Sequence, residues 1–244
     1  MTRLTLVRHG ETYQNRHQIV QGQDPRQGRL TERGMRQARR VGEALAGEPF
    51  DVVHVSTLER AVLTMSQILM ARNEERATPI VFADELQEVN QGVLHGRSHA
   101  EWKAAIEGDP MAWRPAGGES WHDVQARVTR YWREVVLPAG HENILMVAHG
   151  GVNRGLIASL LDIPIAQTWQ GPGIGAPQGN TCINRFHFDD AGRLMHAEVN
   201  DTSHLKDEGE ECGPGQRWIV DERRWELLGP MSTKGEISFF GITG

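Results

Sequence analysis

The sequence predicts an α/β fold with a doubly wound, mostly parallel sheet that has helices on both faces. Short apolar runs alternate with amphipathic stretches through roughly the first 160 residues, which is the order of βαβ units. Two of these runs end in the same dipeptide, His9-Gly10 and His149-Gly150. Because parallel strands end at the same edge of a sheet, we expect both histidines to lie there. At 244 residues, one large domain is long enough to bury its own core.

The first half of the chain supplies three strands and two helices of this pattern. We expect the strands over residues 3–7, 51–55 and 79–82. A first helix over about 31–47 begins at the N-cap Thr31 and buries an apolar face that includes Val41 and Leu45. A second helix is expected over 58–72, where Ser56 or Thr57 would cap the N-terminus.

The second half continues the alternation and then changes character. We expect helical stretches near 98–107 and 120–137, a strand over 143–148 and a helix over 151–162. The Gly- and Pro-rich residues 165–180 predict a loop. Residues 181–188 and 193–199 then predict an antiparallel pair around Asp189–Gly192, at the edge of the sheet.

The chain divides into a domain over 1–205 and a C-terminal extension over 206–244. The extension begins with an acidic, Gly-rich stretch and continues with large apolar side chains such as Trp218, Trp225 and Phe239. Disordered segments contain few aromatic residues, so we expect it to pack on the core or on a second subunit. The sequence thus permits a homodimer without requiring one.

Composition excludes several kinds of partner and cofactor. With 26 basic and 32 acidic residues the net charge is −6, so we expect neither nucleic acid nor a membrane surface as a partner. No apolar run approaches the ~18 residues of a membrane span, and the first residues do not resemble a secretion signal. Two cysteines suit a reducing, cytoplasmic setting. We expect no metal and no other cofactor, because Arg8 beside His9 opposes a bound cation.

The two His-Gly strand ends predict phosphate chemistry. Phosphomonoesters are so inert that an enzyme must replace water with a stronger nucleophile, and a neutral imidazole can attack phosphorus. His9 is the candidate nucleophile, and Gly10 would let the backbone approach the phosphate. The transition state also needs fixed cationic donors, of which Arg8 is the first. Arg60 is the second, since an arginine in the first turn of a helix is unfavourable unless an anion lies nearby.

The remaining candidates surround these groups. His149 would donate to the phosphoryl oxygens together with its neighbour Gly150, and Asn15 can add a neutral hydrogen bond. Gln21 and Gly22 either contact the substrate or make a turn.

Glu88 is the candidate general acid, since a phosphate dianion nearby raises the pKa of a carboxyl group. Glu85, three residues earlier, is the alternative. Trp113 and Trp169 lie in predicted loops and could stack on a substrate.

Together these residues resemble the histidine phosphatase superfamily, in its phosphoglycerate-mutase-like branch, over roughly residues 3–205. The resemblance implies a three-layer sandwich, a phosphorylated His9, phosphate binding by Arg8, Arg60 and His149, proton donation by Glu88 and no metal. The motifs that carry it are Arg8-His9-Gly10-Glu11-Thr12, Asn15, Gln21-Gly22, Leu30 to Gly34, Ser56 through Arg60 to Thr64, Glu88 with Gly92 and Gly96, Gly117 to Ser120, Ala148-His149-Gly150 and Asn180-Thr181.

The resemblance predicts a phosphatase that acts on a small phosphorylated metabolite. A phosphoglycerate mutase is the first alternative, disfavoured because the segment between Gly92 and Gly117 lacks the longer basic insert of glycolytic mutases. The second alternative is an inactive phosphate-binding or interaction protein. Such a protein would be expected to have lost one of the main site residues, which are all present here: His9, Arg8, Arg60, Glu88 and His149. The identity of the phosphoester stays open.

Overall fold

An eight-stranded sheet forms the centre of the molecule in the computed structural model, which describes residues 1–24, 28–72, 77–169, 176–208, 216–221 and 224–228, with side chains up to residue 206. The strand order is β3-β2-β4-β1-β5-β6-β7-β8. The strands are β1 (Thr2–Arg8), β2 (Val52–Ser56), β3 (Ile80–Ala83), β4 (Asn143–Ala148), β5 (Ile183–Phe188), β6 (Leu194–Asp201), β7 (Gln216–Asp221) and β8 (Arg224–Leu228).

The sheet is parallel on one side of β1 and antiparallel on the other. β3, β2, β4 and β1 run parallel to one another, while β5 pairs antiparallel with β1 and each later strand with the one before it. The predicted pair β5 and β6 forms as expected. Its placement at the sheet edge was wrong, because β7 occupies the free side of β6 and satisfies its backbone groups.

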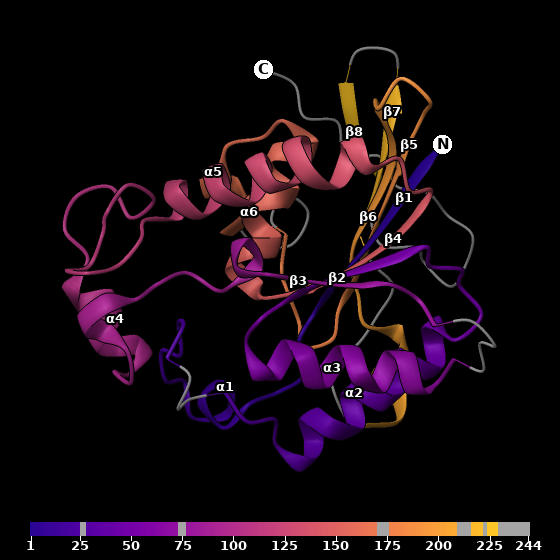
Figure 1. Ribbon diagram of the computed structural model, residues 1–244. Helices are drawn as coiled ribbons and strands as arrows, with labels where there is room; N and C mark the ends of the chain where they lie inside the picture. The colour runs from indigo at the N-terminus through magenta and orange to yellow at the C-terminus, as the bar shows by residue number, and fades with distance from the viewer. Residues whose placement is uncertain (25–27, 73–76, 170–175, 209–215, 222–223, 229–244) are drawn as a thin grey trace.

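Helices cover both faces of the sheet and confirm the predicted doubly wound, three-layer fold. In Figure 1, α2 and α3 lie below the sheet and α5 and α6 lie above it. The helices are α1 (Tyr13–His17), α2 (Glu32–Leu45), α3 (Glu59–Met70), α4 (His99–Ala105), α5 (Trp121–Tyr131) and α6 (Gly150–Leu161). Shorter turns are η1 (Asp84–Leu86), η2 (Gly92–Leu94), the π-turn η3 (Trp132–Val136), η4 (Leu137–Ala139), η5 (Ile165–Trp169) and η6 (Ser203–Glu208).

Two hydrophobic cores follow from the alternation of side chains along the central strands. On β4, Ile144 and Met146 enter the core beneath α5 and α6, whereas Leu145 and Val147 enter the core beneath α2 and α3. A strand buried on both faces appears in the sequence as a continuous apolar run. This explains the uninterrupted apolar residues that precede both His-Gly dipeptides.

Local capping agrees with the sequence in one helix and differs in another. Thr31 caps α2 as predicted, accepting a hydrogen bond from the Gly34 backbone. The N-cap of α3 is Leu58, without a side-chain bond, so the predicted caps Ser56 and Thr57 were wrong. Both hydroxyls have other partners, since Ser56 Oγ lies 2.8 Å from His149 Nε2 and Thr57 Oγ1 donates to Asp84 at 2.7 Å.

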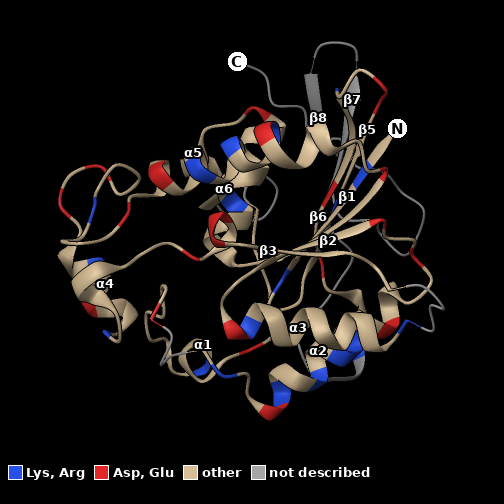
Figure 2. Cartoon of the chain, in the orientation of Figure 1, with Lys and Arg blue, Asp and Glu red and all other residues tan. Residues whose placement is uncertain are grey.

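The described helices carry mixed charge and are too short or too polar to span a membrane. Acidic and basic positions are interspersed along α2 and α5 in Figure 2, in keeping with a net charge of −6. None of the helices in the described ranges is long and apolar enough to cross a bilayer.

Candidate active site

The two predicted histidines lie side by side at the carboxyl edge of the parallel strands. β1 and β4 are in register, with Arg8 opposite Ala148, and the backbone N–H of His9 donates to the Ala148 carbonyl at 3.1 Å. The ring centroids of His9 and His149 are 5.1 Å apart, and both residues are buried. The shared sheet edge therefore delivers the two imidazoles to one place.

His9 is held as a neutral imidazole with one nitrogen free. Its Nδ1 lies 2.7 Å from the Gly10 carbonyl, which can only accept, so Nδ1 carries the proton and Nε2 keeps its lone pair. Burial lowers the pKa of His9 well below its usual value, and the charges of Arg60 and Arg8 lower it further. A neutral ring with an unprotonated Nε2 is the form that attacks phosphorus.

Gly10 is glycine because β1 continues into a loop pressed against α2. A Cβ at Gly10 would lie 2.5 Å from the Gly34 carbonyl oxygen, and one at Gly34 would lie 2.0 Å from the Glu11 carbonyl oxygen. The backbone N–H of Gly10 also donates to Thr64 Oγ1 at 3.1 Å. The structure thus gives Gly10 a packing reason in addition to the expected approach of a phosphate, and this packing fixes the direction of His9.

A cavity of about 240 Å³ opens in front of His9. It brings together seven of the nine predicted site residues, which are Arg8, His9, Asn15, Gln21, Gly22, Arg60 and Glu88. His149 and Gly150 lie behind this surface. Within the described ranges, no three His, Cys, Asp or Glu side chains cluster closely enough to hold a metal ion.

Arg60 is a buried cation held from both ends. Its Nη2 donates to the Gly22 carbonyl at 2.8 Å, and its Nε donates to His149 Nδ1 at 3.1 Å. Burial lowers the pKa of Arg60 to about 10, so the guanidinium stays charged at neutral pH. Gly22 has φ +51°, a left-handed conformation that favours glycine. Gly22 therefore both makes a turn and lines the cavity.

His149 contacts Arg60 and Ser56, and the structure does not place it in the lining of the cavity. Since Arg60 can only donate, His149 Nδ1 is an acceptor, and the proton on Nε2 points to Ser56 Oγ. Burial and the neighbouring arginines lower the pKa of His149 well below its usual value. For His149 to donate to a phosphate as expected, one of these two bonds must break. In this state it orients Arg60.

Arg8 and Asn15 offer donors toward a ligand. Arg8 Nη1 donates to the Gln178 carbonyl, while its buried Nε has no hydrogen-bond partner among the described residues. Burial lowers the pKa of Arg8, which marks a cation with little solvation of its own. Asn15 Oδ1 accepts from the Thr12 backbone and from Asn180, each at 3.2 Å. The amide N–H groups of Asn15 are then the donors available to a ligand.

Arg154 is a further cation that sequence reasoning missed. It lies on α6, four residues after Gly150, and a Cβ on Gly150 would be 3.4 Å from Arg8 Nε and 3.7 Å from Arg154 Nη1. Burial and the charge of Arg8 lower the pKa of Arg154 to about 10. The sequence signal that could have found Arg154 is its spacing. It follows Gly150 by four residues, which places both on one face of the same helix.

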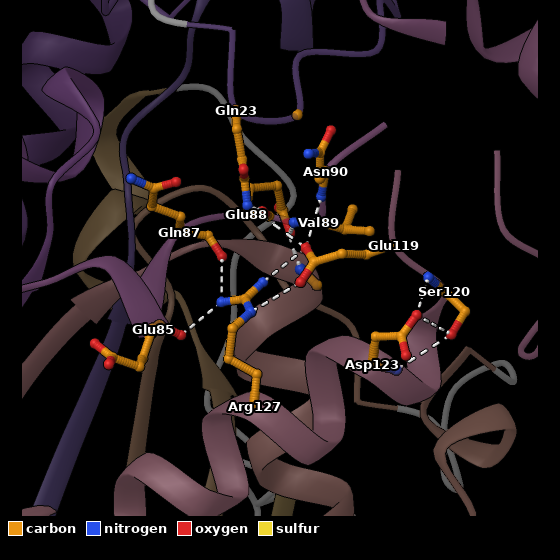
Figure 3. A network of polar contacts seen from close by, with 12 residues as sticks. Gln23, Glu85, Gln87, Glu88, Val89, Asn90, Glu119, Ser120, Asp123 and Arg127 are labelled. Carbon is orange, nitrogen blue, oxygen red and sulfur yellow. Dashed lines mark hydrogen bonds and ion pairs between the residues drawn. The ribbon is translucent and has the colours of Figure 1, made fainter. Parts of the chain in front are cut away.

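Glu88 reaches the site from the loop after η1. Its Oε1 accepts from the Val89 backbone at 2.9 Å, and its Oε2 accepts from the Gly151 backbone at 3.3 Å. A Cβ on Gly151 would lie 2.4 Å from Glu88 Oε1, so only glycine lets the carboxylate approach the start of α6. Glu85 is exposed and does not line the cavity, and in Figure 3 its side chain points away from Glu88.

An ion pair on the far side of this loop holds it in place (Figure 3). Arg127 Nε and Nη2 donate to the two carboxylate oxygens of Glu119, each at 3.0 Å. Arg127 Nη1 also donates to the carbonyls of Glu85 and Gln87, at 2.6 and 3.0 Å. Glu119 Oε2 in turn accepts from the Asn90 backbone at 2.9 Å. This Glu119–Arg127 clamp fixes the backbone on both sides of Glu88.

We expect Arg127→Met to slow hydrolysis of an alkyl phosphate about 10- to 100-fold while changing hydrolysis of p-nitrophenyl phosphate far less. If Glu88 is the expected general acid, its displacement costs most when the leaving group needs a proton. Steady-state kinetics on both esters check this. Arg114→Met, which breaks the exposed Arg114–Asp123 pair at the start of the same helix, is the matched control. An equal loss on both esters would contradict a role in positioning Glu88.

Three buried histidines should make stability depend on pH. Burial lowers the pKa of His9 and His149, and lowers that of His54 to about 4. In the unfolded chain these rings titrate near 6.5, so below that pH the unfolded state binds protons that the folded state excludes. We expect these three rings to lower the free energy of unfolding by about 1.4 kcal/mol each, about 4 kcal/mol together, from pH 7.5 to 5.5. His204, whose pKa burial also lowers to about 4, should add a similar amount.

Urea unfolding at the two pH values measures this difference. His54 lies outside the cavity and bonds Tyr131 at 2.8 Å, so His54→Gln should remove about a quarter of the pH dependence and leave the site histidines in place. Equal stability at pH 7.5 and 5.5 would show that these rings are protonated in the folded state.

Comparison with known proteins identifies relatives over most of the chain. A model of the histidine phosphatase superfamily (branch 1) matches residues 4–201. The adenosylcobalamin/alpha-ribazole phosphatase of Escherichia coli is 33% identical over 174 residues, covering 68% of this chain and 83% of that protein. The 2,3-bisphosphoglycerate-dependent phosphoglycerate mutase 2 of Gloeobacter violaceus is 34% identical over 175 residues, covering 66% and 76%. The crystal structure of the alpha-ribazole phosphatase from Shigella flexneri matches with a TM-score of 0.65 and 30% identity, covering 82% of this chain and 95% of that one.

Proposed function

The chain belongs to the histidine phosphatase superfamily (branch 1) and is a phosphoric monoester hydrolase, and we propose that it hydrolyses a small phosphorylated metabolite through a phosphohistidine on His9, without a metal. The observation that carries this proposal is the single cavity that holds a neutral His9, the cations Arg8 and Arg60 and the carboxyl group of Glu88. These are the nucleophile, the charge-stabilising groups and the acid that a two-step displacement requires.

In the first step, the Nε2 lone pair of His9 attacks phosphorus and the bond to the leaving oxygen breaks. Glu88, protonated when the ester binds, gives its proton to that oxygen, and the alcohol leaves. The hydrogen bond from Nδ1 to the Gly10 carbonyl keeps the ring aimed and supports the positive charge that develops on it.

The cations take up the charge on the phosphoryl oxygens. Arg60 is already fixed by Gly22 and His149, so little reorganisation accompanies the reaction. The unpartnered Nε of Arg8 supports an anion site, since a phosphoryl oxygen would supply the hydrogen bond that this buried donor lacks. Asn15 adds a neutral donor from α1.

In the second step, water replaces the alcohol. Glu88, now ionised, accepts a proton from the water as its oxygen attacks phosphorus, and the bond to His9 Nε2 breaks. Inorganic phosphate and the starting protonation states are regenerated. Each proton that Glu88 gives in the first step returns to it in the second.

Phosphate release from a panel of phosphorylated metabolites, measured in the presence of a chelator, tests this proposal. We expect turnover that survives chelation. Exchange between 2- and 3-phosphoglycerate faster than phosphate release would indicate a mutase instead. Phosphate binding without turnover of any ester would indicate an inactive binding protein.

The proposal assigns the activity to residues 1–205 and packing on the core or on a second subunit to 206–244. β7 and β8 give partial support, because they continue the sheet from β6. The aromatic side chains of this extension lie outside the residues whose side chains are described. Sedimentation of the full chain and of a chain ending at residue 205 would measure the contribution of the extension to a dimer.

Two cysteines in 244 residues support a reducing, cytoplasmic setting.

A further inference from the structure

Three tryptophans line the same cavity as His9 and form what we call the tryptophan wall: Trp102 in α4, Trp121 in α5 and Trp169 in η5. The ring centroids of Trp121 and Trp169 are 4.7 Å apart, and those of Trp102 and Trp121 are 6.4 Å apart. The three rings come from separate elements, and Trp121 contacts each of the other two. They give one side of the cavity a continuous aromatic surface.

Trp121 of this wall lies beside Glu88, the proposed proton donor to the leaving group. An ideal Cβ built on Gly151 would lie 2.4 Å from Glu88 Oε1 and 2.5 Å from the Trp121 ring, so the carboxylate and the ring flank the same glycine. In the proposed mechanism Glu88 protonates the leaving oxygen. The rest of the alcohol therefore begins beside Trp121.

Neighbouring side chains and the hydrophobic core hold the three rings of the wall in place. Trp102 Nε1 donates to Gln91 Oε1 at 2.8 Å, which satisfies the polar end of the ring. The Arg154 guanidinium lies 4.0 Å from the Trp169 ring centre, and Trp121 is buried in the core beneath α6. Immobilised aromatic rings bind a planar ligand with little loss of side-chain entropy.

The size and charge of the cavity limit what the wall can bind. A cavity of about 150 Å³ holds one benzene ring, and this cavity measures about 240 Å³, enough for one ring and a phosphoryl group. Ile19, Val20 and Val89 add further apolar lining. Beyond the phosphate site, the basic residues in the lining are Lys103 and His99, both exposed on α4.

We propose that the leaving alcohol of the substrate carries a planar aromatic ring that stacks on the tryptophan wall, an inference that rests on the proposed phosphatase function. The enzyme would then prefer phosphomonoesters of aromatic alcohols, with one ring close to the ester oxygen, over phosphorylated small acids. A phosphorylated acid would place its carboxylate against indole rings. The cations near the wall offset this little, because Lys103 is exposed and the Arg154 guanidinium is already stacked on the Trp169 ring.

Binding of non-hydrolysable phosphonates tests the wall without relying on catalysis. By titration calorimetry we expect benzylphosphonate to bind about five- to tenfold more tightly than cyclohexylmethylphosphonate, which has a ring of similar size without a π-face. We also expect it to bind more tightly than 3-phosphonopropionate, which carries a carboxylate. Equal affinity for the two rings, or tighter binding of the carboxylate, would overturn the inference.

Variants of the tryptophans test where the aromatic ring of the ligand binds in the cavity. Trp169→Leu should reduce the benzyl to cyclohexylmethyl affinity ratio to about one, and Trp102→Leu serves if that variant does not fold. Trp113→Leu is the matched control, because Trp113 does not line the cavity and should keep the wild-type ratio. A ratio that survives in both wall variants would overturn the inference.

Turnover separates this inference from the proposed function. Hydrolysis of benzyl phosphate about five- to tenfold faster in kcat/KM than cyclohexylmethyl phosphate would support both, since the two esters have similar alkoxide leaving groups. If no ester were hydrolysed, the proposed function would fail, and the affinity ratio for the phosphonates would still decide the role of the wall.

Discussion

His9→Ala is expected to lower kcat on an alkyl phosphate by at least about ten-thousand-fold. The variant removes the atom that forms the covalent bond to phosphorus, and the remaining cations bind the ester without offering a replacement nucleophile. Phosphate binding should persist, because Arg8 and Arg60 hold their positions through Gln178, Gly22 and His149. Single-turnover kinetics and the affinity for inorganic phosphate measure the two effects.

The covalent intermediate gives this prediction a direct control. Rapid quenching of the wild-type enzyme with labelled ester should trap one labelled phosphoryl group on His9, and His9→Ala should trap none. His122→Ala replaces an exposed histidine of α5 and should retain both label and rate. Label on a residue other than His9, or a rate in His9→Ala within about tenfold of wild type, would contradict the assignment of the nucleophile.

Glu88→Gln is expected to lower the rate on an alkyl phosphate by about 100- to 1,000-fold. Glutamine preserves the shape of the side chain but cannot give a proton to the leaving oxygen or take one from water. p-Nitrophenolate leaves without a proton, so formation of the phosphoenzyme from p-nitrophenyl phosphate should slow by less than about fivefold. Burst kinetics, which separate formation from hydrolysis of the phosphoenzyme, measure the difference.

Glu85→Gln distinguishes the two candidate acids. Glu85 is exposed and contacts Arg127 through its backbone carbonyl, so replacing its side chain should leave the rate on both esters unchanged. If instead the alkyl phosphate were slowed in Glu85→Gln and not in Glu88→Gln, the acid would be Glu85. Equal slowing of both esters in Glu88→Gln would mean that the side chain acts in binding.

The part of the site that lies at strand ends could be predicted from sequence. Two apolar runs that end in His9 and His149 meet because parallel strands share an edge, and the register of Arg8 with Ala148 realises this geometry. Arg60 was found because a cation in the first turn of a helix indicates an anion nearby. Each of these inferences uses only local spacing and the rules of parallel sheets.

The parts that depend on packing between distant segments could not be predicted in this way. The tryptophan wall joins Trp102, Trp121 and Trp169 from three elements, and nothing in their spacing indicates a shared cavity. The Glu119–Arg127 clamp depends on how α5 meets the loop that carries Glu88. β7 and β8 lie in the extension, for which no strand was predicted although Trp218, Ile219 and Val220 favour one, and the edge of β6 supplies their place in the sheet.

The central position of β1 has a consequence for synthesis of the protein. β1 leaves the ribosome before β4 and β5, with which it pairs, and Arg8 meets its partner Ala148 only after 140 more residues have been added. At about 5 to 20 residues per second, that wait lasts roughly 7 to 28 seconds. Throughout it, the apolar strand that leads to His9 has neither neighbour, which leaves its edges open to aggregation, and the site can assemble only late in translation.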